Sequence, residues 1–136
     1  MPCPLFEPRE VAADAHYPKA RLPLLEEYDG FCHAANEVMR PPKELRFACC
    51  NHGYSRGSCP HFPASEDRSA LRFDVLVSSP DLIELLLVSE TEHFPINWAR
   101  YRYCVATETL EPEPADICTR AQIVAFCRSY LRRFSR

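Results

Sequence analysis

The sequence predicts an α+β domain: a three-stranded antiparallel meander covered by a C-terminal helix, with a loop-rich N-terminal cap that holds most of the cysteines. Three observations support this. The first half is rich in proline and weak in periodicity, apolar alternation with a period of two begins near residue 70, and an amphipathic helical pattern ends the chain. With 136 residues, the chain is the size of one ordinary domain, so we expect residues 1–66 and 67–136 to form one compact unit.

Three segments alternate apolar and polar residues in the way a half-buried strand does. They are residues 70–78, 82–90 and 99–105, separated by a turn at 79–81 and a loop at 91–97. Consecutive strands with short connections favour an antiparallel meander. Alternating aromatic residues in a strand are usually part of the core, and we expect this of three of them: Trp98, Tyr101 and Tyr103.

Helical signals occur in both halves. The segment from Thr119 to Gln122 fits a capping box and opens the C-terminal helix, after an acidic, proline-interrupted linker at 108–116. In the first half, residues 41–53 read as a short helix, with proline in its first turn and glycine just past its end. A second short helical piece is predicted at 8–15. The C-terminal helix is expected to cover one face of the sheet and leave the cap at an edge or end of it.

Every glycine of the chain lies beside a cysteine. Gly30 precedes Cys32 by two residues, and Gly53 and Gly57 lie between Cys50 and Cys59. Glycine permits positive φ and lets backbone N–H groups approach closely, as thiolate-bound metals and clusters require. We therefore expect the backbone to bend around a centre held by sulfur.

Four cysteines of the first half are the candidate metal ligands: Cys3, Cys32, Cys50 and Cys59, with Cys49 as a competitor for Cys50. Four thiolates can close a tetrahedral zinc site or hold a [4Fe–4S] cluster. The chain has no Cys-x-x-Cys pair of the kind that usually begins a structural zinc site, and two of the four cysteines precede proline, as the last cysteine of the bacterial ferredoxin run does. The spacing favours the cluster, with zinc as the alternative.

Three segments carry a resemblance: residues 3–8 (Cys-Pro-Leu-Phe-Glu-Pro), 30–32 (Gly-Phe-Cys) and 50–63 (Cys-Asn-His-Gly-Tyr-Ser-Arg-Gly-Ser-Cys-Pro-His-Phe-Pro). They resemble a family of uncharacterised small bacterial proteins with the patterns CPxFEP, GxFC and CNxGYxRGxCPxFP. The resemblance covers the N-terminal half and implies a shared site at the same four cysteines, Cys49 being left out. It implies no known activity, and it leaves the positions of His52 and His61 free.

Other residues are expected beside the centre as supporting groups: Gly30, His52, Gly53, Arg56, Gly57 and His61. His52 and His61 lack the spacing of paired histidine ligands, so they are interpreted as loop residues that hydrogen-bond carbonyl groups. Arg56 is expected to offset the negative charge of a thiolate-ligated centre, the alternative being an anion-binding turn at residues 55–57. The remaining cysteines are interpreted as buried thiols: Cys49, Cys104, Cys118 and Cys127.

Composition limits the functional classes. The net charge of −3 gives no basic field, so nucleic acid is a poor candidate as partner. No secretory signal and no membrane-spanning stretch is evident, which favours the cytoplasm, where eight cysteines are ligands and reduced thiols. Phosphate-binding loops, Gly-x-Ser-x-Gly and His-Glu-x-x-His are absent from the sequence, so no enzyme class is indicated.

The first hypothesis is therefore a small iron–sulfur protein whose cluster transfers electrons to a redox or protein partner or stabilises the fold. The second is a structural zinc module that mediates protein or nucleic-acid interaction. The even number of cysteines leaves a third, an exported disulfide-bonded domain. Oligomeric state is not indicated.

Overall fold

The computed structural model describes residues 2–15, 22–54 and 57–134. The elements follow one another as β1 (Phe6–Val11), β2 (Tyr28–Cys32), α1 (Lys43–Leu45), the π-helical segment η1 (Arg46–Asn51), β3 (Ala70–Ser78), β4 (Leu82–Thr91), β5 (Phe94–Cys104), β6 (Thr109–Glu111) and α2 (Ile117–Phe134). The predicted α+β class is confirmed. None of the helices in these ranges is long and apolar enough to cross a membrane.

The larger sheet has four antiparallel strands in the order β3-β4-β5-β6, so the prediction of three strands was wrong. Strand β6 lies inside the predicted acidic linker, and it is too short to show a period. Strand β5 begins at Phe94, so most of the loop predicted at 91–97 is strand. The turn is reduced to Glu92 and His93, both with positive φ, as a two-residue hairpin requires.

The N-terminal cap contains a sheet of its own, in which β1 pairs antiparallel with β2. The short helix predicted at 8–15 is therefore wrong, because residues 6–11 are strand. Pro8 is tolerated there since a two-stranded sheet has only edge strands, and the register shifts between Pro8 and Glu10. Pairing with a distant segment, Phe6 opposite Cys32, decides the conformation of β1.

The short helix predicted at 41–53 is confirmed in position, but only its first turn is α-helical. Residues 46–51 are π-helical, and the His52 N–H donates to the carbonyl of Phe47 at 3.2 Å. Asn51, which has no exposed surface, donates its Nδ2 to the carbonyl of Arg46 at 2.8 Å and to that of Tyr28 at 2.9 Å. These bonds give the widened turn internal partners and fix it to β2.

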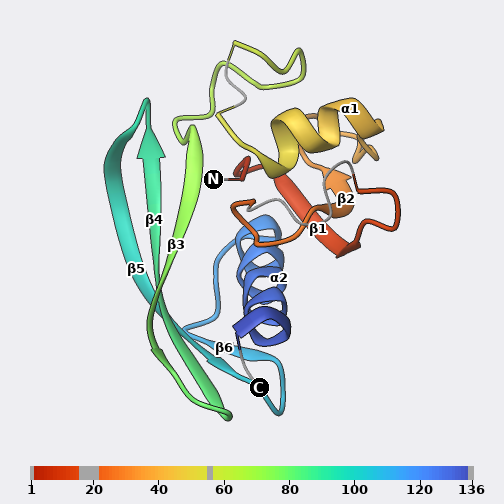
Figure 1. Ribbon diagram of the computed structural model, residues 1–136. Coiled ribbons are helices and arrows are strands. Elements are labelled where there is room, and N and C mark those ends of the chain that lie inside the picture. Colours follow the sequence, from red (N-terminus) through yellow and green to blue (C-terminus); the bar gives the residue numbers. More distant parts are fainter. Residues whose placement is uncertain (1, 16–21, 55–56, 135–136) are drawn as a thin grey trace.

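Helix α2 lies between the four-stranded sheet and the cap (Figure 1). On the sheet side, the ring of Phe126 stacks on that of Phe73 with 5.2 Å between centroids, and Ile123 and Cys127 have no exposed surface. They share one apolar cluster with residues of the sheet: Leu71, Ile83, Leu85, Leu87, Tyr103 and Leu110. The prediction that this helix covers one face of the sheet is confirmed.

The other side of α2 holds the cap by hydrogen bonds. Gln122, fully buried, donates its Nε2 to the carbonyl of Cys3 at 2.7 Å and to that of Phe6 at 2.9 Å. The hydroxyl of Tyr28 donates to the carbonyl of Ala125 at 2.9 Å. The cap therefore packs mainly on the helix, and it meets the sheet edge where the Leu71 N–H donates to the carbonyl of Pro2.

The capping box predicted from Thr119 to Gln122 is wrong, because another residue caps the helix. The carboxylate of Asp116 is the cap, because it accepts the backbone N–H of Thr119 at 2.8 Å and its hydroxyl at 2.7 Å. The side chain of Gln122 does not return to the first turn of α2, since it donates hydrogen bonds to the N-terminal cap instead.

Gly30 provides a test of the β1–β2 pairing. A Cβ at this position would lie 2.0 Å from the carbonyl oxygen of Glu7 and 2.9 Å from the Cα of Pro8, so the strands must separate. Gly30→Ala is expected to lower the free energy of unfolding by about 3 kcal/mol, measured by urea denaturation. Gly57→Ala is the matched control: it meets nothing within 4 Å, its φ is +85°, and it should cost only about 1–2 kcal/mol. Equal losses in the two variants would contradict this reason for Gly30.

Candidate metal centre

Cys3 and Cys50 are brought together by the backbone. The N–H of Cys3 donates to the carbonyl of Cys50 at 3.0 Å, and the carbonyl of Cys3 accepts from Phe6 at 3.1 Å and from Gln122. Both cysteines are buried. The start of the chain is thereby fixed against η1 through main-chain groups, which a side-chain substitution at either cysteine leaves in place.

Cys32 ends β2 in a position fixed on two sides. It lies opposite Phe6 in the register with β1, and it exchanges two backbone hydrogen bonds with Met39, at 2.7 and 3.1 Å. The next residue, His33, donates its backbone N–H to the carbonyl of Leu5 at 2.9 Å. Cys32 is partly exposed.

Cys59 belongs to the loop after η1. The loop leaves the helix at Gly53, whose φ is +87° and whose N–H donates to the carbonyl of Cys49 at 3.0 Å. Gly57 also has a positive φ, +85°, and the Phe62 N–H closes a turn on the carbonyl of Cys59 at 3.2 Å. Backbone that glycine adopts most easily thus occurs twice in the loop, both times before Cys59. Arg56, the expected counter-charge, lies outside the described residues.

The five thiols of the cap affect one another electrostatically. The pKa of Cys50 is raised well above its ordinary value, first by burial and then by the charges of Cys3, Cys32, Cys59 and Cys49. Burial and the charge of Cys59 also raise the pKa of Cys32 and of Cys49. The four predicted ligands and Cys49 are therefore within electrostatic range of Cys50, although they come from three segments that are far apart in the sequence.

These neighbours do not form a finished coordination shell. Over residues 2–15, 22–54 and 57–134, no group of three or more His, Cys, Asp or Glu side chains is arranged so that it can hold a metal ion. All eight cysteines are free thiols, so no disulfide links the candidate ligands. A metal or cluster would have to draw the sulfur atoms of the cap closer together.

The two loop histidines stay at the surface. His52 is exposed, with its ring 6.1 Å from that of Phe47, and His61 is exposed beyond Cys59. His33 has a defined polar partner, since its Nε2 lies 2.7 Å from the carboxylate of Glu7, a buried side chain. A signal for this pair was present in the sequence, since Glu7 is part of the Cys-Pro-Leu-Phe-Glu-Pro segment and His33 follows Cys32.

A buried ion pair supports the helix that carries Cys49 and Cys50. The guanidinium of Arg46 donates through Nε at 2.8 Å and Nη2 at 2.5 Å to the carboxylate of Glu27, and Nη2 lies 3.0 Å from Asp14. Although burial lowers the pKa of Arg46, the two carboxylates more than offset it and leave that pKa raised, so the guanidinium is charged. Removing either partner of such a pair would leave a buried charge without compensation. The pair therefore holds η1 against the segment before β2.

A second anchor joins the loop to the sheet. The hydroxyl of Tyr54 donates to the carboxylate of Glu90, and its ring stacks on that of His93 with 4.1 Å between centroids. Burial, followed by this hydrogen bond and the charge of Glu90, raises the pKa of Tyr54 to about 12. The start of the loop that leads to Cys59 is thus held by the β4–β5 hairpin.

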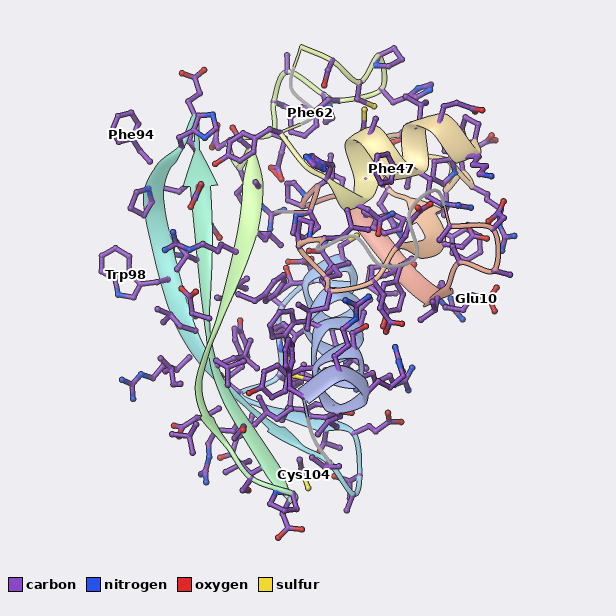
Figure 2. The ribbon with its side chains drawn as sticks, viewed as in Figure 1. Glu10, Phe47, Phe62, Phe94, Trp98 and Cys104 are labelled. Atoms are coloured by element: carbon purple, nitrogen blue, oxygen red, sulfur yellow. The ribbon has the colours of Figure 1, made fainter. Side chains whose placement is uncertain are left out.

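The remaining cysteines divide into two kinds. Cys118 and Cys127 are buried as predicted, and burial is the first cause that raises the pKa of each to about 12. The prediction was wrong for Cys104, which is partly exposed because it ends β5 at the hairpin before β6. Figure 2 shows it at the end of the molecule opposite to Phe47. Hydrogen bonds from the hydroxyl and backbone of Thr107, and from the backbone of Ala106, lower the pKa of Cys104.

No protein-family model matches the chain, and comparisons with curated proteins and with solved structures likewise found no match. The functional argument therefore depends on the chemistry of the cysteines.

Thiol reactivity tests the environment of Cys104. A lowered pKa increases the thiolate fraction at neutral pH, and the thiolate is the nucleophile. Cys104 is therefore expected to react first with iodoacetamide at pH 7, and Thr107→Val should slow that reaction severalfold because it removes the first stabilising hydrogen bond. Peptide mapping after timed alkylation measures both rates. Cys118 is the internal control, since its pKa of about 12 keeps it protonated; labelling of Cys118 ahead of Cys104 would contradict the assignment.

Proposed function

We propose that the protein is a small iron–sulfur protein in which Cys3, Cys32, Cys50 and Cys59 bind a [4Fe–4S] cluster. The observation that supports this proposal best is the gathering of the four cysteines around Cys50. They come from the start of the chain, the end of β2, η1 and the following loop.

The electrostatics of the cap favour a cationic guest. Burial is the first cause that raises the pKa of Cys50, and repulsion from the charges of the other thiolates adds to it. Iron or zinc reverses this, because a bound metal cation stabilises deprotonated sulfur. Ligation would also supply the free energy that draws the sulfur atoms together, since metal binding is coupled to folding in small metal-binding domains.

The donor chemistry fits an iron–sulfur cluster. Thiolate sulfur is the usual ligand of a [4Fe–4S] cluster, and the wide spacing of the four cysteines is acceptable because a cubane takes sulfur from any direction. When bound, the cluster supplies one-electron transfer or a covalent staple for the cap. Cys3 and Cys50 are buried, whereas Cys32 and Cys59 are partly exposed. A redox partner would thus approach the side of Cys32 and Cys59.

The proposal extends to the compartment. Eight free cysteines suit a reducing environment, and thiolate-bound iron requires one. We therefore propose a cytoplasmic protein with a protein partner. Zinc remains the alternative metal, and the experiment below distinguishes zinc from an iron–sulfur cluster.

Metal content tests the ligand set. Protein purified without oxygen is expected to be brown and to contain iron and sulfide in equal amounts. Replacing any one of the four ligands with serine should lower the iron content at least tenfold, because serine is a poor ligand for this cluster. The matched controls are Cys49→Ser and Cys118→Ser, buried thiols that should keep their iron. Zinc without a visible absorption band would assign the second hypothesis, and an unchanged iron content in Cys59→Ser would contradict the ligand set.

Removal of the metal tests its effect on folding. Because the cluster would join the segments of the cap and touch no strand of the larger sheet, its removal by a chelator under reducing conditions is expected to weaken the cap first. Hydrogen exchange should speed up by at least tenfold at the amides of β1 and β2 and remain slow in β4. Equal acceleration in both sheets would show that the centre does not act on the cap alone.

A further inference from the structure

Strand β5 leaves most of one edge open. Its partner on that side, β6, pairs only with residues 102–104, so in the described part of the chain residues 94–101 have β4 on one side and no strand on the other. The Trp98 N–H shows the consequence: it donates to the side-chain Oδ1 of its own neighbour, Asn97, at 2.9 Å. The other edge strand, β3, is partly covered, because the Leu71 N–H donates to Pro2.

The same segment carries the most exposed large apolar side chains of the described residues. Phe94 is 73% exposed and Trp98 66%, with Ile96 at 50% between them. Both aromatic rings project from the same side of β5 and away from the body of the protein (Figure 2). A long apolar edge strand of this kind is a template for pairing with another strand.

The second half of the strand is basic. Arg100 and Arg102 follow the aromatic half, and neither forms a close ion pair in the described ranges. The register sets Arg102 opposite Glu84 of β4 and Glu111 of β6, whereas Arg100 lies opposite Leu86. Thus β5 has an exposed aromatic first half and a basic second half, in which Arg100 has no acidic residue opposite it in the register. Arginine over an aromatic face is an attractive pair.

We propose that the chain forms a two-fold homodimer in which β5 pairs antiparallel with β5 of a second copy, joining the two sheets into one. Antiparallel pairing sets the aromatic half of each strand against the arginine half of the other, so that Phe94 meets the guanidinium of Arg100 from the second copy. It also keeps the arginines of the two copies at opposite ends. A two-fold contact of this type uses one surface twice and closes, so it does not propagate into fibres.

Charge complementarity favours a second copy over an acidic extended peptide. A peptide rich in carboxylates would neutralise Arg100 and Arg102 but leave the exposed faces of Phe94 and Trp98 without partners. The second copy supplies both partners from one sequence. The contact uses no cysteine of the cap, so the dimer should form with or without metal.

The experiment measures the oligomeric state of the full chain by sedimentation velocity from about 1 to 200 μM, under reductant that excludes disulfide formation through Cys104. The wild type is expected to dimerise in this range. Trp98→Glu and Arg100→Glu should each weaken the dimer at least tenfold, the first by loss of apolar contact and the second by loss of the guanidinium. Val77→Glu, which alters an apolar residue of β3 that is 52% exposed, is the matched control and should dimerise as the wild type does.

Circular dichroism of each variant verifies folding, and a second measurement does not depend on substitution. Hydrogen exchange at residues 96–100 should slow as the wild-type concentration rises, while exchange along β3 stays constant. A wild type that is monomeric at every concentration, with or without binding to a polyglutamate peptide, would overturn the proposal. A dimer that Trp98→Glu and Arg100→Glu leave unchanged would overturn it as well.

Discussion

Burial of α2 on two sides is the constraint on which the rest of the structure depends. The helix packs Ile123 and Phe126 against the four-stranded sheet and presents Gln122 to the cap, which it holds by the carbonyls of Cys3 and Phe6. The Oε1 of Gln122 is buried without a hydrogen-bond partner in the described residues, a cost of about 1–3 kcal/mol. Two donated bonds to the start of the chain offset this cost, and they fix the segment from which Cys3 projects.

Fixed backbone around the candidate centre explains how thiols from distant segments can be held close to one another without a disulfide. Cys3 is bound to η1, Cys32 to β1 and residue 39, and the loop before Cys59 to the β4–β5 hairpin through Tyr54. Burial, and then repulsion from the other thiolates, opposes ionisation of Cys50 in this arrangement and raises its pKa. The proposed cluster is the component that would turn this repulsion into attraction. The fixed backbone of the cap and the chemistry of its thiols therefore both support the proposal of a bound cluster.

The two sides of α2 have separate properties. The cysteines of the cap lie on one side of α2, whereas Cys104 and the open edge of β5 belong to the larger sheet on the other (Figures 1 and 2). The proposed dimer would use only the sheet, leaving the partly exposed cysteines Cys32 and Cys59 accessible to a redox partner. Assembly and metal chemistry can thus be altered independently by substitution.

Local pattern in the sequence was sufficient for the α+β class, the strands β3 and β4, the position of α1 and η1, and the burial of Cys118 and Cys127. Each of these depends on neighbours along the chain, through alternation, helical period or the conformational freedom of Gly53. Tertiary structure alone decided that residues 6–11 are strand, that β6 exists and that Trp98 and Cys104 are exposed. Those features depend on which distant segment lies beside them: β1 is strand because β2 pairs with it, and Trp98 is exposed because no element of the described residues covers the face of the sheet that is turned away from α2 (Figure 1). Sequence periodicity shows which residues are buried only where burial recurs at a regular interval along the chain. Pairing between remote segments follows no such interval, so the sequence pattern does not reveal it.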